Sequence, residues 1–278
     1  MKKINVNLFL SFMVILNVLQ AQQITVATFN LRYENQRDTG NLWKDRAPVA
    51  AALIRFHSFD IFGTQEGLKT QLDDLLKLLP EYESYGRGRD DGQSKGEHSA
   101  IFYRKTKYQL LDKGDFWLSE TPDQPGFGWD ATFNRICSWV KLKDKQKMKE
   151  FFVFNVHYDH RANKARIESS KLMINKIKGI AGNNPVILTG DFNGSNQTEW
   201  YRYIQQSAIL KDVLYQVEHP YINNGSFNGF SNNIADDIID HVFVTKHFRP
   251  LRYGILTDTY KGKFPSDHFP VLADLLFE

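Results

Sequence analysis

The chain has 278 residues, 42% of them apolar and 24% charged, and these are the proportions of an ordinary globular protein. A net charge of +3 spread over this length creates no obvious attractive field, so the composition permits nucleic acid as a partner without indicating it. The 21 Phe and 12 Tyr predict a large β-rich core. The one cysteine, Cys137, excludes an internal disulfide and is expected to be a buried apolar residue.

The first 21 residues have the pattern of a secretory signal peptide. Lys2 and Lys3 form a basic start, residues 8–19 are mostly apolar, and Ala21 offers a small residue for cleavage. The apolar run is short for a membrane span, and an uncleaved anchor is the alternative. We therefore expect export, to the periplasm or beyond the cell, of a mature monomer that begins near residue 22 and has no transmembrane segment.

The apolar periodicity predicts alternating strands and helices in the first half and consecutive strands later. Residues 97–104 and 107–118 look like adjacent strands with a tight link, and residues 219–233 are rich in Asn and Gly and predict a loop. In chain order we predict a strand at 24–30, a helix at 45–57, a strand at 60–64, a helix at 68–79, the strands 97–104, 107–118, 135–142 and 151–157, a helix at 161–181, and strands at 185–189, 238–244 and 271–277.

The organisation predicted from this order is one domain over residues 22–278. The sequence contains no repeat, no low-complexity linker and no break in composition. Such an order of elements favours two sheets packed face to face with helices outside. Ligands favour the strand ends of such folds, and several polar clusters follow predicted strands.

The chemistry begins with the acidic and histidine residues near the end of the chain. A histidine such as His268 that meets a second carboxylate, Asp240, suits general-base work, while the neighbouring Asp267 is free to bind a metal. Asn30 and Glu66 supply the oxygen ligands that Mg²⁺ prefers, although either alone is also an ordinary turn or cap residue. Together at strand ends, these residues predict a metal-assisted hydrolase of phosphate esters.

Two further clusters complete the set. His157 ends a buried strand, where a purely structural histidine would also be at home. Asp191 and Asn193 follow Gly190, and as alternate residues they can face the same side.

In order along the chain, these motifs resemble those of the endonuclease/exonuclease/phosphatase superfamily, which includes DNase I-like nucleases, deadenylases, inositol polyphosphate 5-phosphatases and neutral sphingomyelinases. The resemblance runs from about residue 24 to residue 276 and implies a four-layer α/β/β/α sandwich of two mixed sheets flanked by helices. It rests on Thr28-Phe-Asn-Leu-Arg, Gly63-Thr-Gln-Glu-Gly, Asn155-Val-His, Gly190-Asp-Phe-Asn, Ile239-Asp-His-Val-Phe and Ser266-Asp-His-Phe-Pro-Val.

The resemblance implies a role for each matched catalytic residue. Asp191 would orient or deprotonate the attacking water, and Asn193 would contact a phosphate oxygen. His268, oriented by Asp240, would serve as the second acid or base or bind the phosphate. His157 would bind the scissile phosphate or act as general acid.

The resemblance also implies a metal site and supporting residues. Asn30 and Glu66, with Asp267 near them, would hold Mg²⁺, with Mn²⁺ or Ca²⁺ as alternatives. Glu97 lies seven residues before an arginine, as does the glutamate that supports the equivalent of His157 in DNase I-like strands, so we expect the two to pair. Substrate contacts are expected from Arg32, Arg135 and Asn228.

The substrate is the least determined part of this prediction. We expect a phosphodiesterase or nuclease-like enzyme acting on nucleotides, nucleic acid or small phosphodiesters outside the cytoplasm. The alternatives are a phosphomonoesterase and a sphingomyelinase-like lipid phosphodiesterase, the latter favoured by the aromatic residues of the segment 116–129. A binding protein that retained the fold without catalysis is a further alternative.

Overall fold

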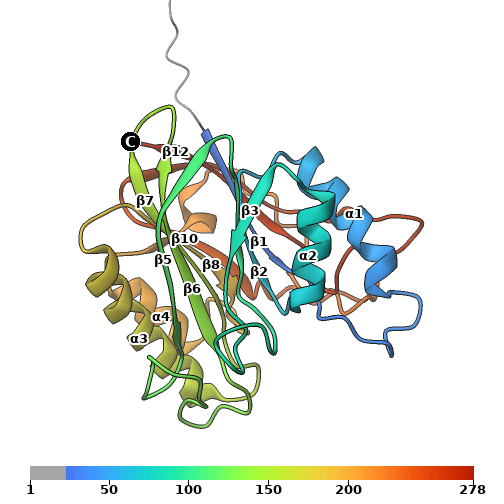
Figure 1. Ribbon diagram of the computed structural model, residues 1–278, viewed down its shortest axis with the longest axis horizontal. Helices are drawn as coiled ribbons and strands as arrows, with labels where there is room; N and C mark the ends of the chain where they lie inside the picture. Colours follow the sequence, from blue (N-terminus) through green and yellow to red (C-terminus); the bar gives the residue numbers. More distant parts are fainter. Residues whose placement is uncertain (1–22) are drawn as a thin grey trace, which may run out of the picture.

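The computed structural model describes residues 23–278, so the signal peptide expected at 1–21 lies outside the described residues. Within the described part, no helix is long and apolar enough to cross a membrane. Two six-stranded sheets run through the molecule, and the ribbon is coloured along the chain in Figure 1.

The first sheet has the strand order β11-β12-β1-β2-β4-β3 and the second has the order β5-β6-β7-β8-β10-β9. Each is mixed, because β1 and β2 are parallel in the first sheet and β7 and β8 are parallel in the second, while the other pairs are antiparallel. The strands of the first sheet are β1 (Gln23–Asn30), β2 (Ile61–Gln65), β3 (Tyr82–Tyr85), β4 (Ile101–Arg104), β11 (Phe248–Ile255) and β12 (Val271–Phe277). Those of the second are β5 (Tyr108–Trp117), β6 (Ile136–Asp144), β7 (Glu150–His157), β8 (Val186–Asp191), β9 (Lys211–Asp212) and β10 (Asp240–Val244).

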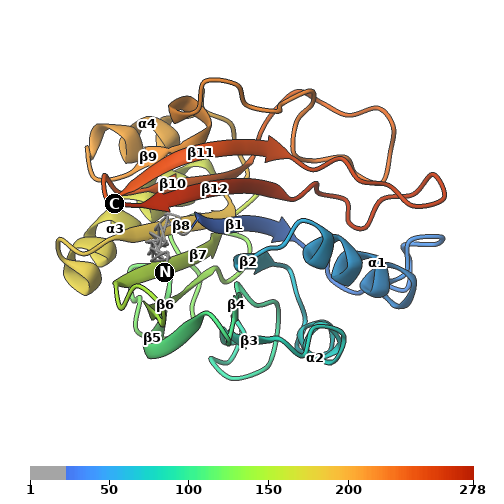
Figure 2. The same cartoon turned by 90° about the horizontal axis from the view of Figure 1, so that it is seen from above.

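Helices cover the outer faces of both sheets, giving four layers. Figure 2 shows α1 (Trp43–Phe56) and α2 (Lys69–Leu78) on one side of the molecule and α3 (Asn163–Ala181) and α4 (Glu199–Gln206) on the other. One apolar cluster fills the space between the sheets, and two more join each sheet to its helices. The predicted four-layer α/β/β/α sandwich is confirmed.

The local sequence explains these layers. Central strands such as β1 are buried on both faces, because one face meets the helices and the other meets the second sheet. Their sequences are therefore nearly continuous apolar runs. Helix α3 instead buries one stripe, including Met173, Ile174 and Ile177, and leaves its lysines outside.

A buried polar network ties the two sheets together beneath one rim. The side-chain amide of Asn155 on β7 donates to the carbonyl oxygens of Thr64 and Ala100 at 2.8 and 3.0 Å. Its Oδ1 accepts from Gln65 Nε2 at 2.7 Å and from Thr189 Oγ1 at 3.0 Å. A Cβ on Gly63 would lie 2.2 Å from this Oδ1, so the close approach requires glycine at that position.

The strand ends bring the polar motifs together. Asn30 is paired with Gln65 at the ends of the parallel strands β1 and β2, and His157 is paired with Asp191 at the ends of β7 and β8. Asp240 begins the antiparallel β10 opposite Asp191. Five separated segments therefore deliver their side chains to the same rim.

One prediction about the strands is wrong. The segments predicted as adjacent strands at 97–104 and 107–118 belong to different sheets, since β4 pairs with β2 and β3 whereas β5 pairs with β6. The short link between them crosses from one sheet to the other, and Asp60 anchors it by accepting from Lys107 Nζ at 2.6 Å.

Candidate active site

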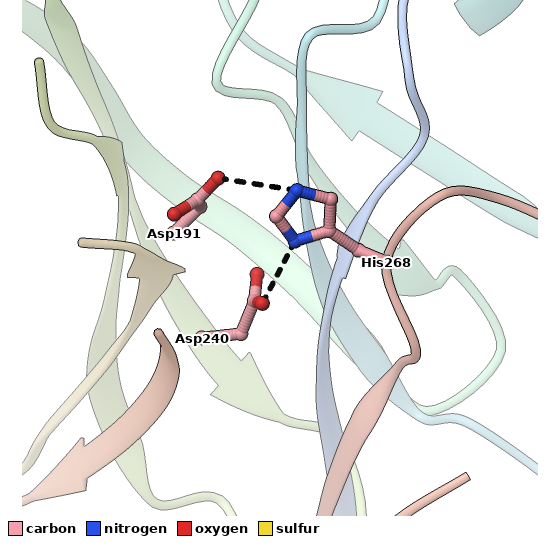
Figure 3. Close-up of side chains that lie close together, drawn as sticks. All are labelled: Asp191, Asp240 and His268. Atoms are coloured by element: carbon pink, nitrogen blue, oxygen red, sulfur yellow. Dashed lines mark hydrogen bonds and ion pairs between the residues drawn. The ribbon is translucent and has the colours of Figure 1, made fainter. Parts of the chain in front are cut away.

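The charged centre of the rim is formed by Asp240, His268 and Asp191 (Figure 3). His268 Nδ1 lies 2.9 Å from Asp240 Oδ2, and its Nε2 points to Asp191 Oδ2 at 3.8 Å. Burial alone would lower the pKa of His268, but the carboxylates of Asp240 and Asp191 outweigh it and raise this pKa well above its usual value. The ring is therefore an imidazolium held between two carboxylates.

Asp191 is the carboxylate on which the other polar groups converge. Its Oδ1 accepts from the backbone of Asn193 at 2.9 Å, and its Oδ2 accepts from the Asn30 amide at 3.0 Å. Burial and the charge of Asp240 raise the pKa of Asp191 to about 7. A carboxylate with such a pKa can both hold and release a proton near neutral pH.

His157 also lies next to Asp191, with its Nε2 3.5 Å from Oδ2, but it is in a different protonation state. The Asn193 amide donates to the Tyr158 carbonyl and to His157 Nε2, both at 3.0 Å, so Nε2 is an acceptor and the ring proton resides on Nδ1. Burial and the charges of Arg135 and Arg89 lower the pKa of His157 well below its usual value. His157 is thus neutral, whereas His268 is charged.

Glu97, expected to pair with His157, is nearby but has a stronger partner. Its Oε2 lies 3.8 Å from His157 Nδ1 and only 2.6 Å from Arg89 Nη1. Burial raises the pKa of Glu97 to about 7 against the opposing charge of Arg89. The contact with His157 is therefore looser than the Asp240–His268 hydrogen bond.

The expected metal residues lie on the β1–β2 side of the centre. Glu66 accepts from the Asn30 amide at 3.2 Å and from the backbone of Tyr33 at 3.1 Å. It adopts a φ of 62°, a left-handed conformation that is rare for glutamate and is characteristic of functional sites. The amide nitrogen of Asn30 faces both Glu66 and Asp191, so Asn30 also positions these two carboxylates.

Asp267 provides the second carboxylate at this end. The Arg32 guanidinium lies between Glu66 and Asp267, at 4.0 and 3.8 Å, while its closest partner is Asp38 at 2.9 Å. Burial raises the pKa of Asp267 to about 6, His268 opposes this, and Glu66 adds to it. Asp267 is buried and Glu66 is half-buried, and the guanidinium near both is held by Asp38, so these two carboxylates fit a hard divalent cation. Ligand atoms of Asp191, Asp240 and His268 also lie within 4.8 Å of one another, but a cation there would have to displace the His268 proton.

One cavity of about 540 Å³ joins these groups. Asn30 and Asp240 are completely buried and support its floor from below. The candidate residues that line it are Arg32, Glu66, Glu97, Arg135, His157, Asp191, Asn193, Asp267 and His268.

Asn228, which was expected to contact the substrate, is buried and is not among the residues that line the cavity. Its Nδ2 donates to the Ser266 carbonyl at 3.1 Å and its Oδ1 accepts from the backbone of Phe230 at 2.8 Å. Its own backbone N–H donates to the Asp267 carbonyl at 2.8 Å. In the structure, then, Asn228 braces the segment that carries Asp267 and His268.

Comparison with known families adds a direct observation. The model of the Endonuclease/Exonuclease/phosphatase family matches residues 27–268. The chain belongs to this family.

Several solved structures are similar to this chain in both sequence and fold. An endonuclease/exonuclease/phosphatase family protein from Bacteroides thetaiotaomicron is 47% identical, with a TM-score of 0.90 over 92% of this chain and 96% of that one. A mannosyl-6-phosphatase from the same organism is 48% identical, with a TM-score of 0.89 over 91% of this chain and 100% of that one. An uncharacterized protein of Acanthamoeba polyphaga mimivirus is 26% identical over 85% of this chain and 92% of its own length. As a member of this family, the protein has the fold of phosphoester hydrolases.

Several residues of the cavity were not predicted as site residues. Except for Ile239, which opens the motif Ile239-Asp-His-Val-Phe, they lie outside the six family motifs, where sequence patterns carry little positional information. The signals available were the Gly-rich segment around Arg89, the aromatic ring of Tyr33 next to Arg32, the position of Phe227 next to Asn228, and the short distance of His160 and Arg161 from His157. The unpredicted lining residues are Tyr33, Arg89, Phe133, His160, Arg161, Phe227 and Ile239.

Arg135, which was expected to contact the substrate, lines the cavity although only 4% of its surface is exposed. Its Nη2 is 3.1 Å from His160 Nδ1 and its Nε is 3.6 Å from Asp159. Its Nε and Nη1 have no hydrogen-bond partner among the described residues. A buried guanidinium with free donors beside the cavity fits an anionic or polar ligand group.

Proposed function

We propose that this protein is a divalent-metal-dependent phosphomonoesterase that acts on small phosphate esters. The observation that carries the proposal is one cavity whose lining combines the carboxylates of Glu66, Asp191 and Asp267 with the cationic side chains of Arg135 and His268. A phosphate at Asp191 would have, within the same cavity, carboxylates that can bind a cation and charged hydrogen-bond donors.

The preference for monoesters rests on similarity. The relative described as a mannosyl-6-phosphatase is 48% identical and is covered over its whole length. This similarity supports a phosphomonoesterase, which the sequence analysis left open as an alternative, rather than the phosphodiesterase that was expected first. A curated relative with a nuclease name, the CCR4-Not complex 3′-5′-exoribonuclease subunit Ccr4 of Mycosarcoma maydis, is only 22% identical, and this chain covers 44% of that protein.

The residues present fit a divalent cation. Glu66 and Asp267 would hold it, and Mg²⁺ is the first choice because the ligands are hard oxygens. Asn30 would orient Glu66 through its amide N–H, because its own Oδ1 accepts from the Arg32 backbone at 3.0 Å. Such a cation supplies charge neutralisation at a phosphate oxygen.

The protein groups would perform the proton and charge chemistry. Asp191, with its raised pKa, would orient the attacking water and accept its proton. Charged His268, fixed by Asp240, would stabilise negative charge developing on the phosphate. The Asn193 amide would complete these contacts, and in-line attack by water requires no phosphorylated enzyme intermediate.

The N-terminal pattern of Lys2, Lys3 and the apolar run at 8–19 supports the further proposal that the enzyme acts outside the cytoplasm. Fractionation of cells expressing the full chain tests this. Activity confined to the cytoplasm with residue 1 retained would contradict export.

The test of the activity is a substrate panel under Mg²⁺ and Mn²⁺ titration. p-Nitrophenyl phosphate and hexose 6-phosphates are compared with bis-p-nitrophenyl phosphate and with DNA and RNA oligonucleotides. We expect kcat/KM for the best monoester to exceed that for any diester by about a hundredfold or more, a difference of ~3 kcal/mol in transition-state stabilisation. Turnover of diesters without turnover of monoesters would overturn the proposal.

A further inference from the structure

The cavity extends beyond the reacting groups along a wall that none of the family motifs supplies. We call Arg89, Phe133, His160 and Arg161 the Phe133 wall; they come from the loop after β3, the loop before β6 and the segment after β7. A cavity of about 540 Å³ has room for more than a phosphate group. The wall therefore faces the alcohol part of an ester.

The members of the wall contact one another around one aromatic ring. The rings of Phe133 and His160 are stacked, with centroids 5.9 Å apart and an interplanar angle of 19°. The Arg89 guanidinium lies 5.4 Å from the centre of the Phe133 ring. Phe133 nevertheless remains 42% exposed, and it lines the cavity.

The loops hold this wall in place. The indole nitrogen of Trp117 donates to the Arg89 carbonyl at 2.7 Å, and the backbone of Arg89 donates to the Glu97 carbonyl at 3.0 Å. Arg135, buried beneath, contacts His160 Nδ1 at 3.1 Å. The wall is thus a fixed surface, and its exposed ring is available to a ligand.

The polar groups of the wall include both donors and an acceptor. Arg89 and Arg161 carry guanidinium donors, whereas Glu97, hydrogen-bonded to Arg89, brings a carboxylate. Hydroxyl groups both donate and accept, so this mixture of guanidinium donors and a carboxylate acceptor suits a polyol. An aromatic ring beside such groups suits the apolar C–H face of a sugar ring.

The wall also begins next to the phosphate position. Glu97 links it to His157, since its Oε2 lies 3.8 Å from His157 Nδ1. A sugar ring separated from the phosphate by a single exocyclic carbon would be the part of the substrate next to the wall. We infer that the Phe133 wall binds the pyranose ring of a phosphorylated sugar whose phosphate lies at Asp191. This inference rests on the proposed phosphomonoesterase function.

The experiment compares steady-state kinetics of the unchanged protein, Phe133→Ala, Phe133→Tyr and Phe127→Ala. Phe127 is the matched control, because it is 64% exposed on the same loop but does not line the cavity. The substrates are a hexose 6-phosphate, its methyl glycoside, glycerol 3-phosphate and a nucleoside 5′-monophosphate. Comparing the free sugar with its glycoside distinguishes a free sugar phosphate from a phosphorylated glycan end.

We expect Phe133→Ala to lower the ratio of kcat/KM for the hexose phosphate to that for glycerol 3-phosphate by about tenfold, the size of a lost aromatic contact. The loss should lie mainly in KM, Phe133→Tyr should restore the ratio, and Phe127→Ala should leave it unchanged.

Two results would overturn the inference alone: an unchanged ratio in Phe133→Ala, or a preference of the unchanged protein for the nucleotide over the hexose phosphate. If the unchanged protein hydrolysed no phosphomonoester at all, the proposed function itself would fail, so the two failures are distinguishable.

Discussion

At the scale of single residues, the site contains two histidines in opposite protonation states, both with Nε2 near Asp191 Oδ2. His268 is charged because Asp240 and Asp191 surround it, and His157 is neutral because it is buried beside Arg135 and Arg89. The sequence predicted that these residues would meet, because each follows or begins a strand. It did not predict that His157 is neutral, because this depends on burial and on the charges of Arg135 and of Arg89, the latter from a loop without periodicity.

The raised pKa of Asp191 leads to a prediction about stability. In the unfolded chain this carboxyl has its ordinary pKa of 3.8, whereas in the folded protein its pKa is about 7. Folding therefore favours the protonated form of Asp191. As the pH rises from 4 to 7, ionisation of this carboxyl lowers the free energy of unfolding, and above pH 7 the loss is constant. We expect Asp191→Asn to raise the melting temperature in EDTA by about 5 °C at pH 8, with a smaller gain at pH 5.

Thermal unfolding of Asp191→Asn and of the control Asp112→Asn at both pH values checks this. Asp112 is exposed on β5, so its replacement should have no pH-dependent effect. A gain from Asp191→Asn that is equal at the two pH values, or a loss at pH 8, would contradict the account.

At the scale of elements, the long buried strands were the most predictable features. β1, β2, β7, β8 and β10 carry apolar runs, and predicting where they end also predicted the positions of Asn30, Glu66, His157, Asp191 and Asp240. The strands β3, β9 and β11 and the short helix α4 were not predicted. β11 is partly exposed and contains Pro250 at an irregularity in its pairing, so it shows neither an apolar run nor clean alternation.

The inter-sheet network centred on Asn155 allows a prediction at this scale. Asn155→Ala removes two donated and two accepted hydrogen bonds and leaves buried partners on both sheets without a replacement. We expect a loss of about 3 kcal/mol in the free energy of unfolding, measured by urea denaturation. Asn183→Ala, at an exposed position after α3, is the control. An unfolding midpoint of Asn155→Ala equal to that of the control would show that the network contributes little.

At the scale of the whole molecule, the fold places the ends of both sheets at one rim and lets loops complete the cavity. The order of strands and helices was enough to predict two packed sheets with helices outside. It was not enough to assign β4 and β5 to different sheets, because a three-residue link resembles a hairpin whether or not the strands pair. The Phe133 wall also escaped prediction, since three loops distant in sequence build it.

The central claim is that the cavity hydrolyses phosphate monoesters with a cation at Glu66 and Asp267 and a proton acceptor at Asp191. The most direct measurement is phosphate release from a monoester as a function of Mg²⁺ concentration in the unchanged protein, Glu66→Gln and Asp191→Asn. We predict no release in EDTA, recovery with Mg²⁺, a higher Mg²⁺ requirement in Glu66→Gln, and a loss of about a thousandfold in kcat for Asp191→Asn at saturating Mg²⁺. Full activity in EDTA, or Asp191→Asn within threefold of the unchanged protein (a difference of ~0.7 kcal/mol), would contradict the account.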